Sequence, residues 1–311
     1  MRKIPLLASV SLAALLASPL YAQVASSSAP PVGKPTVRSL HVVVYTSREV
    51  AGMANSFLIC ADKDAILFDV VQTRTDASRL ADMVDASGKR LTTIFISHAH
   101  PDHYLGLDVL ATRFPNARIA ALPEVVQDIK TSGPALQKLL QARWGTDGPE
   151  RLVVPEPLDA DTITLEGMDV RVLRFGGGES AHLGALFLPQ TGDLFCGDLV
   201  YNQFHLFLRE KRVDDWLAIL DEFAVTAKKQ GVLRIFPGHG RPASRDVIEA
   251  NRQYLRDFRQ ALTSGSRADV QKTMLARYPD YAMSGFLTGF TLDAYFPAPL
   301  TPPPTERMKK P

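Results

Sequence analysis

Hydrophobic residues in the first half of the chain form short runs that alternate with segments of helical spacing. Residues 76–87 place Leu80, Met83 and Val84 on one face, and Gly88 follows, so a helix is predicted there. Runs rich in β-branched or aromatic residues are typical of strands. Such runs occur at residues 40–45, 55–60, 65–70, 93–97 and 118–122.

The second half repeats this alternation. Strands are predicted at residues 162–165, 169–175, 184–188, 193–196 and 233–236. The remaining helices are predicted at residues 105–114, 124–144 (interrupted at Gly133-Pro134), 214–229 and 243–262. Two similar halves, each a sheet with helices on its outer side, predict an α/β (α+β) fold, a four-layer αββα sandwich. We expect one catalytic domain over residues 38–296, because the candidate site residues come from both halves.

The first 22 residues have the features of a secretory signal peptide. Arg2 and Lys3 precede an apolar run over residues 4–17, which is short for a membrane span, and Leu20-Tyr21-Ala22 resembles a cleavage site. A periplasmic or secreted protein is therefore expected, with no stable membrane insertion after cleavage. A retained N-terminal anchor is the alternative. Residues 23–37 and 297–311 are predicted to be a disordered lead-in and tail.

The charge of the chain gives no indication of a nucleic-acid partner. The net charge is +2, from 35 basic and 33 acidic residues, and removal of Arg2 and Lys3 leaves 33 of each. Cys60 and Cys196 each lie in an apolar run, where two buried thiols are favoured over a disulfide.

The segment His98-Ala99-His100-Pro101-Asp102-His103 directly follows a predicted strand. Four side chains that can ligate a metal fall within six residues, and zinc accepts imidazole nitrogen and carboxylate oxygen. A polar cluster without metal would leave many of these groups without hydrogen-bond partners. The segment therefore predicts a metal site.

Three more candidate ligands lie at the ends of predicted strands in the second half. His182 precedes the strand at 184–188, Asp198 follows the strand at 193–196, and His239 follows the strand at 233–236. Each alone is more often structural than a ligand. Because strand ends meet at one edge of a sheet, we expect all three to join the first cluster.

With these motifs in place, the chain resembles the metallo-β-lactamase superfamily. The shared motifs are HAHPDH at 98–103, SAHLG around His182, GD at 197–198 and GHG at 238–240. The resemblance implies the αββα fold and two zinc ions per chain, with iron or manganese as alternatives. It assigns the first zinc to His98, His100 and His182, the second to Asp102, His103 and His239, and a bridging role to Asp198. The aspartate resembles the hydrolase and lactonase branches more than the cysteine-containing lactamases.

This assignment implies hydrolysis of a small acyl compound, an ester, lactone or related cyclic acyl bond, by a hydroxide shared between the two metals. A β-lactamase and an iron-dependent oxidoreductase similar to persulfide dioxygenases are the alternatives. Asp102 is expected to orient the nucleophile. Tyr201 and His205 either donate hydrogen bonds to substrate or have local structural roles. The aromatic residues over 278–296 either cover the site or pack the C-terminal part, and packing is favoured.

Overall fold

The computed structural model describes residues 40–297. The predicted signal peptide over 1–22, the lead-in over 23–37 and residues 298–311 of the predicted tail lie outside the described residues. None of the helices within residues 40–297 is long and apolar enough to cross a membrane.

The first sheet has six strands, which are neighbours in the order of the sequence. They are β1 (His41–Thr46), β2 (Asn55–Cys60), β3 (Asp64–Phe68), β4 (Arg90–Ile96), β5 (Arg118–Ala121) and β6 (Glu156–Pro157). The first three are antiparallel, and β3 to β6 run parallel to one another. Every residue of β2 is buried, as expected for a strand covered on both faces.

The second sheet has five strands, in the spatial order β11-β10-β9-β8-β7. They are β7 (Thr162–Leu165), β8 (Met168–Gly176), β9 (His182–Leu188), β10 (Asp193–Tyr201) and β11 (Arg234–His239). The pairing of β10 with β11 is parallel, so the carboxyl ends of both strands lie at the same edge.

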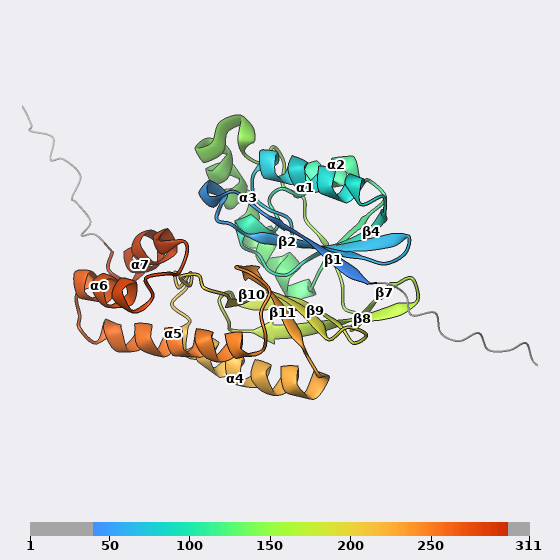
Figure 1. Ribbon diagram of the computed structural model, residues 1–311. Coiled ribbons are helices and arrows are strands. Elements are labelled where there is room, and N and C mark those ends of the chain that lie inside the picture. Colours follow the sequence, from blue (N-terminus) through green and yellow to red (C-terminus); the bar gives the residue numbers. More distant parts are fainter. Residues whose placement is uncertain (1–39, 298–311) are drawn as a thin grey trace, which may run out of the picture. The chain divides into compact units, whose positions relative to one another are not determined.

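Helices cover the outer face of each sheet (Figure 1). On the first sheet these are α1 (Arg74–Ala86), α2 (Leu107–Arg113) and α3 (Pro123–Trp144), and on the second α4 (Val213–Gln230) and α5 (Asp246–Leu262). Shorter elements are η1 (Glu49–Ala51), η2 (Pro101–His103), η3 (Gly145–Asp147), α6 (Arg267–Arg277), the π-helix η4 (Phe286–Thr291) and α7 (Leu292–Tyr295). The architecture is the four-layer αββα sandwich that the sequence predicts.

Aromatic side chains fill the space between the two sheets. The ring of Phe57 on β2 lies 5.4 Å from that of Phe195 on β10 and 5.5 Å from that of Phe236 on β11. All three belong to one buried cluster that joins both sheets. Cys60 and Cys196 are buried free thiols, which confirms the expectation from their apolar surroundings. This core fixes the edge at which the polar side chains meet.

The structure corrects one predicted helix and adds another. Gly133 and Pro134 do not interrupt α3, which continues to Trp144. An internal proline costs about 3 kcal/mol, and burial of side chains along α3, such as Ile129 and Leu140, offsets that cost. Helix α6 was not predicted, since only two of its residues are buried and its apolar periodicity is weak.

Candidate metal centre

Two loops and two neighbouring strands bring the candidate ligands together. The segment from His98 to His103 leaves the end of β4, Asp198 lies within β10, and His239 is the last residue of β11. Glu179 lies in the turn between β8 and β9. Close approach depends on Gly238, where any Cβ would overlap the carboxylate of Asp198.

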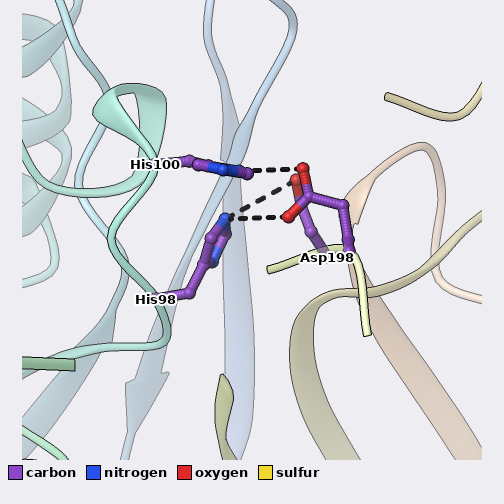
Figure 2. Close-up of side chains that lie close together, drawn as sticks. His98, His100 and Asp198 are labelled. Atoms are coloured by element: carbon purple, nitrogen blue, oxygen red, sulfur yellow. Dashed lines mark ion pairs between the residues drawn. The ribbon is translucent and has the colours of Figure 1, made fainter. Parts of the chain in front are cut away.

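The first ligand group consists of His98, His100, Glu179 and Asp198, whose ligand atoms all lie within 4.8 Å of one another. His100 Nδ1 is 2.8 Å from Glu179 Oε1, and His98 Nε2 is 3.7 Å from Glu179 Oε2. Figure 2 shows both imidazoles directed at carboxylates on the opposite side of the site, Asp198 among them. Two imidazoles and carboxylate oxygens facing one point are a donor set suited to zinc.

The second group consists of Asp102, His103 and His239. Asp102 Oδ2 lies 3.5 Å from His239 Nε2 and 3.9 Å from His103 Nε2. Both histidines are buried, whereas the side chain of Asp102 is 18% exposed. The group can therefore hold a second ion while Asp102 remains accessible from the cavity that it lines.

Asp198 lies between the two groups. Its Oδ1 is 3.3 Å from His103 Nε2, and its Oδ2 is 3.4 Å from His239 Nε2 and 3.8 Å from His98 Nε2. One carboxylate thus faces histidines of both groups, which is the arrangement that a ligand shared by two ions requires.

Several buried polar atoms of the two ligand groups have no hydrogen-bond partner. These atoms show whether the residues fit metal ions. A buried polar atom without a hydrogen-bond partner costs about 1–3 kcal/mol. Buried atoms without such a partner include His98 Nε2, His103 Nε2, Asp198 Oδ1 and Glu179 Oε2. Two bound cations would satisfy these atoms together, so the residues fit a pair of metals.

The charges at the site also fit cation binding. Burial alone would lower the pKa of His239, but Asp198 and Asp102 raise it to about 9. Burial alone would raise the pKa of Asp102, but His103 and His239 lower it to about 2. Burial raises the pKa of Glu179 to about 7. Without metal, protons occupy positions that a metal would take, so binding displaces them.

Asp69 was not predicted from the sequence. It contacts His103 directly and His98 through Ser97, on the sides of the imidazoles that face away from the ligand groups. Its Oδ2 is 2.9 Å from His103 Nδ1 and accepts a hydrogen bond from Ser97 Oγ at 2.7 Å. Ser97 Oγ in turn lies 2.8 Å from His98 Nδ1. The available signal was an acidic residue directly after the apolar run of β3. Such outer contacts fix the orientation of metal-binding imidazoles.

Asp69→Asn is expected to weaken metal binding, measured with zinc, about 10- to 100-fold, because it removes the charge that orients His103. Competitive titration against a chromophoric chelator measures the affinity. Asp257→Asn is the control, since this buried carboxylate bonds Tyr278 on another part of the chain. Unchanged zinc affinity in a folded Asp69→Asn protein would remove Asp69 from the site.

His182 lies outside the groups of residues that could hold a metal, and Glu179 occupies the place in the first group where His182 was expected. His182 opposes Gly176 in the pairing of β8 with β9, and its Nδ1 lies 2.7 Å from Asp128 Oδ2 on α3. Its side chain is 42% exposed, whereas Glu179 is buried. The strand pairing sends the histidine toward α3, and the preceding turn sends the glutamate inward.

Tyr201 and His205, both candidates for contact with substrate, have different positions. Tyr201 lines the cavity, donates a 2.6 Å hydrogen bond to Asp198 Oδ2 and stacks on His239. His205 Nδ1 lies 2.9 Å from the Tyr254 hydroxyl, away from the ligand groups. Burial lowers the pKa of His205 to about 4, so the imidazole is neutral at neutral pH. His205 does not line the cavity, which favours the local structural role that the sequence left open.

Comparison with known proteins places this site in a family. The sequence model of the metallo-beta-lactamase superfamily matches residues 50–252. The chain belongs to the metallo-β-lactamase superfamily. Solved members share its fold: a metallo-beta-lactamase family protein from Thermus thermophilus has a TM-score of 0.56 at 20% identity and covers 79% of this chain and 91% of its own. A metallo-beta-lactamase from Pontibacter korlensis has a TM-score of 0.54 at 16% identity. The match covers 71% of this chain and 99% of that protein.

Curated metallo-β-lactamase-fold relatives include hydroxyacylglutathione hydrolases. The protein of Actinobacillus pleuropneumoniae serotype 3 is 28% identical over 141 residues, 45% of this chain and 47% of the relative. The protein of Haemophilus ducreyi is 30% identical over 112 residues, which are 36% of this chain and 37% of the relative. The chain thus spans less than half the length of these relatives.

Proposed function

We propose that the chain is an exported hydrolase with two zinc ions that cleaves a carboxylic ester, thioester or lactone. The observation that carries this proposal is the position of Asp198 between two ligand groups at the wall of one cavity. The curated relatives are hydrolases by name and support an acyl substrate. Mass spectrometry of the mature N-terminus tests export, and an intact Met1 would contradict it.

Zinc pairs of this kind lower the pKa of a water molecule and polarise the acyl oxygen when they are bound. The residues of the chain then position the reactants. Asp102 stays ionised at neutral pH, because its pKa is about 2, and it lines the cavity. Its carboxylate would accept a hydrogen bond from the attacking water and pass the proton that the water loses to the leaving oxygen or sulfur.

The second ligand group favours this hydrolase over a one-iron oxidoreductase. A single ion at His98, His100 and Glu179 would leave Asp102, His103 and His239 unused. A β-lactamase would use the same residues, so only the substrate distinguishes it from an esterase or lactonase.

The experiment is an activity screen of the mature protein loaded with zinc. The panel contains simple thioesters, esters, lactones and the chromogenic β-lactam nitrocefin, and metal content is measured on the same sample. We expect two zinc ions per chain and turnover of the esters, thioesters or lactones. One iron per chain with oxygen consumption would overturn the proposal, and turnover of nitrocefin alone would replace it with the lactamase.

Tyr201→Phe is expected to lower kcat about 10- to 100-fold with KM unchanged, since a hydrogen bond to a carboxylate contributes about 1.5–3 kcal/mol. The hydroxyl holds Asp198 and contacts no other group that the mechanism uses, so Tyr201 is a positioning residue. Tyr254→Phe removes an equally buried hydroxyl that bonds His205, and it should leave kcat unchanged. Equal kcat for the two variants would exclude the positioning role.

A further inference from the structure

The cavity over the metal centre is much larger than an ester bond requires. Its volume is about 760 Å³, within the range of ~300–1,000 Å³ for sites that hold drug-sized ligands. Its lining includes the buried ligands Glu179, Asp198 and His239 together with exposed apolar residues, so it reaches from the metal centre to the surface. The space beyond the ligands is large enough for the rest of a substrate.

One wall is a series of aromatic rings that begins at the metal ligands. Phe207 packs edge-on against His100 at 5.4 Å between ring centroids, and Phe286 packs edge-on against His239 at 5.3 Å. Phe290 follows at 5.7 Å from Phe207 and is 38% exposed. Phe286 and Phe290 lie on the π-helix η4, a rare element that is frequent at functional sites.

Helix α3 and η1 add further apolar side chains to the lining, beside the polar residues Asp128, Thr131, Ser132 and Arg143 of α3. Leu136, Leu139 and Leu140 of α3 line the cavity together with Val50 of η1. Within residues 40–297, seven large apolar side chains are exposed, and three of them, Val50, Leu139 and Phe290, line this one cavity. Exposed apolar residues gathered at a cavity mark a binding surface, whereas scattered ones have no such meaning.

We propose that the hydrolysed acyl compound carries a large apolar group, an aliphatic chain or a ring system, which lies between the aromatic wall and α3. This inference rests on the proposed hydrolase function. A small polar acyl group would leave the apolar walls in water. Each methylene of a longer group removes apolar surface from water and adds about three- to fourfold in affinity.

A series of S-ethyl thioesters from acetyl to decanoyl tests this preference, with turnover followed through the released thiol. For the protein loaded with zinc, kcat/KM is expected to rise about threefold per methylene, mainly through KM. Binding of decanoate, measured by calorimetry, provides a readout that does not depend on turnover. A flat or falling series together with no binding of decanoate would overturn the proposal.

Matched variants locate the effect. Leu139→Ser and Phe290→Ser should each lower kcat/KM about tenfold more for the decanoyl thioester than for the acetyl thioester. Leu233→Ser is the control, because Leu233 is 68% exposed, against 62% for Leu139, and does not line the cavity. Equal losses in the control would overturn the proposed site.

The two proposals fail in different ways. If no thioester is hydrolysed but decanoate binds and the two variants weaken it, the apolar site stands and the hydrolase is wrong. If the acetyl ester is hydrolysed while longer chains are neither preferred nor bound, the hydrolase stands and the apolar group is wrong.

Discussion

Asp198→Asn is expected to reduce turnover by about 10³-fold or more and to lower the metal content from two ions per chain toward one. The carboxylate faces His98, His103 and His239 at 3.3–3.8 Å, so the substitution removes negative charge from both ligand groups at once. Charge stabilisation by bound metal is worth several kcal/mol in a transition state, and each ~1.4 kcal/mol is a factor of ten in rate. Steady-state kinetics and metal analysis of the same sample measure both effects.

A second buried aspartate on the same strand provides the control. Asp193 lies at the start of β10, is 2% exposed and pairs with Arg234. Asp193→Asn should therefore affect stability but leave the metal content and kcat unchanged. Full metal content and near-normal kcat in Asp198→Asn would show that the carboxylate is not shared between two ions.

The sequence was sufficient for those parts of the site that depend on local geometry. His98 to His103 leave one strand end in a single short segment, so their proximity follows from their spacing alone. Asp198 and His239 could be placed because β10 and β11 are parallel neighbours, with their carboxyl ends at one edge. The alternation of strands and helices likewise predicted the two sheets.

The remaining parts depend on directions that spacing does not fix. Glu179 and His182 are three residues apart, and only the pairing of β8 with β9 decides which of them points into the site. Asp69 has a left-handed backbone with φ of 62°, and this conformation aims its carboxylate at His103. The aromatic residues over 278–296 divide between two roles. Tyr281 stacks on Tyr254, as the packing interpretation predicted, while Phe286 and Phe290 line the cavity.

Removal of metal is expected to lower Tm by roughly 10 °C and to reverse the pH dependence of stability. A ligand at 1,000 times its Kd adds about 4 kcal/mol to the free energy of unfolding. For a domain of this size, each kcal/mol raises Tm by about 2–4 °C. Metals bind deprotonated ligands, so the stability of the loaded protein should rise between pH 6 and 9.

The metal-free protein should show the opposite slope. The pKa of His239 rises from 6.5 in the unfolded chain to about 9 in the folded one, and that of His103 is also raised. A raised folded pKa stabilises the protein fully below pH 6.5, and this contribution is lost as the pH approaches 9. The pKa of Glu179 is raised to about 7, so Glu179 also makes the folded protein less stable as the pH rises toward neutral. Asp102, with its pKa lowered to about 2, contributes equally throughout this range.

Thermal unfolding at pH 6, 7, 8 and 9, with stoichiometric zinc or with chelator, separates the two slopes. The difference in Tm between the zinc-loaded and the metal-free protein should increase steadily with pH. In Asp198→Asn the metal-free slope should flatten, because the carboxylate that raises the pKa of both His103 and His239 loses its charge. Parallel curves with a constant gap would mean that these histidines do not exchange protons for metal, and the two-metal assignment would then lose its electrostatic basis.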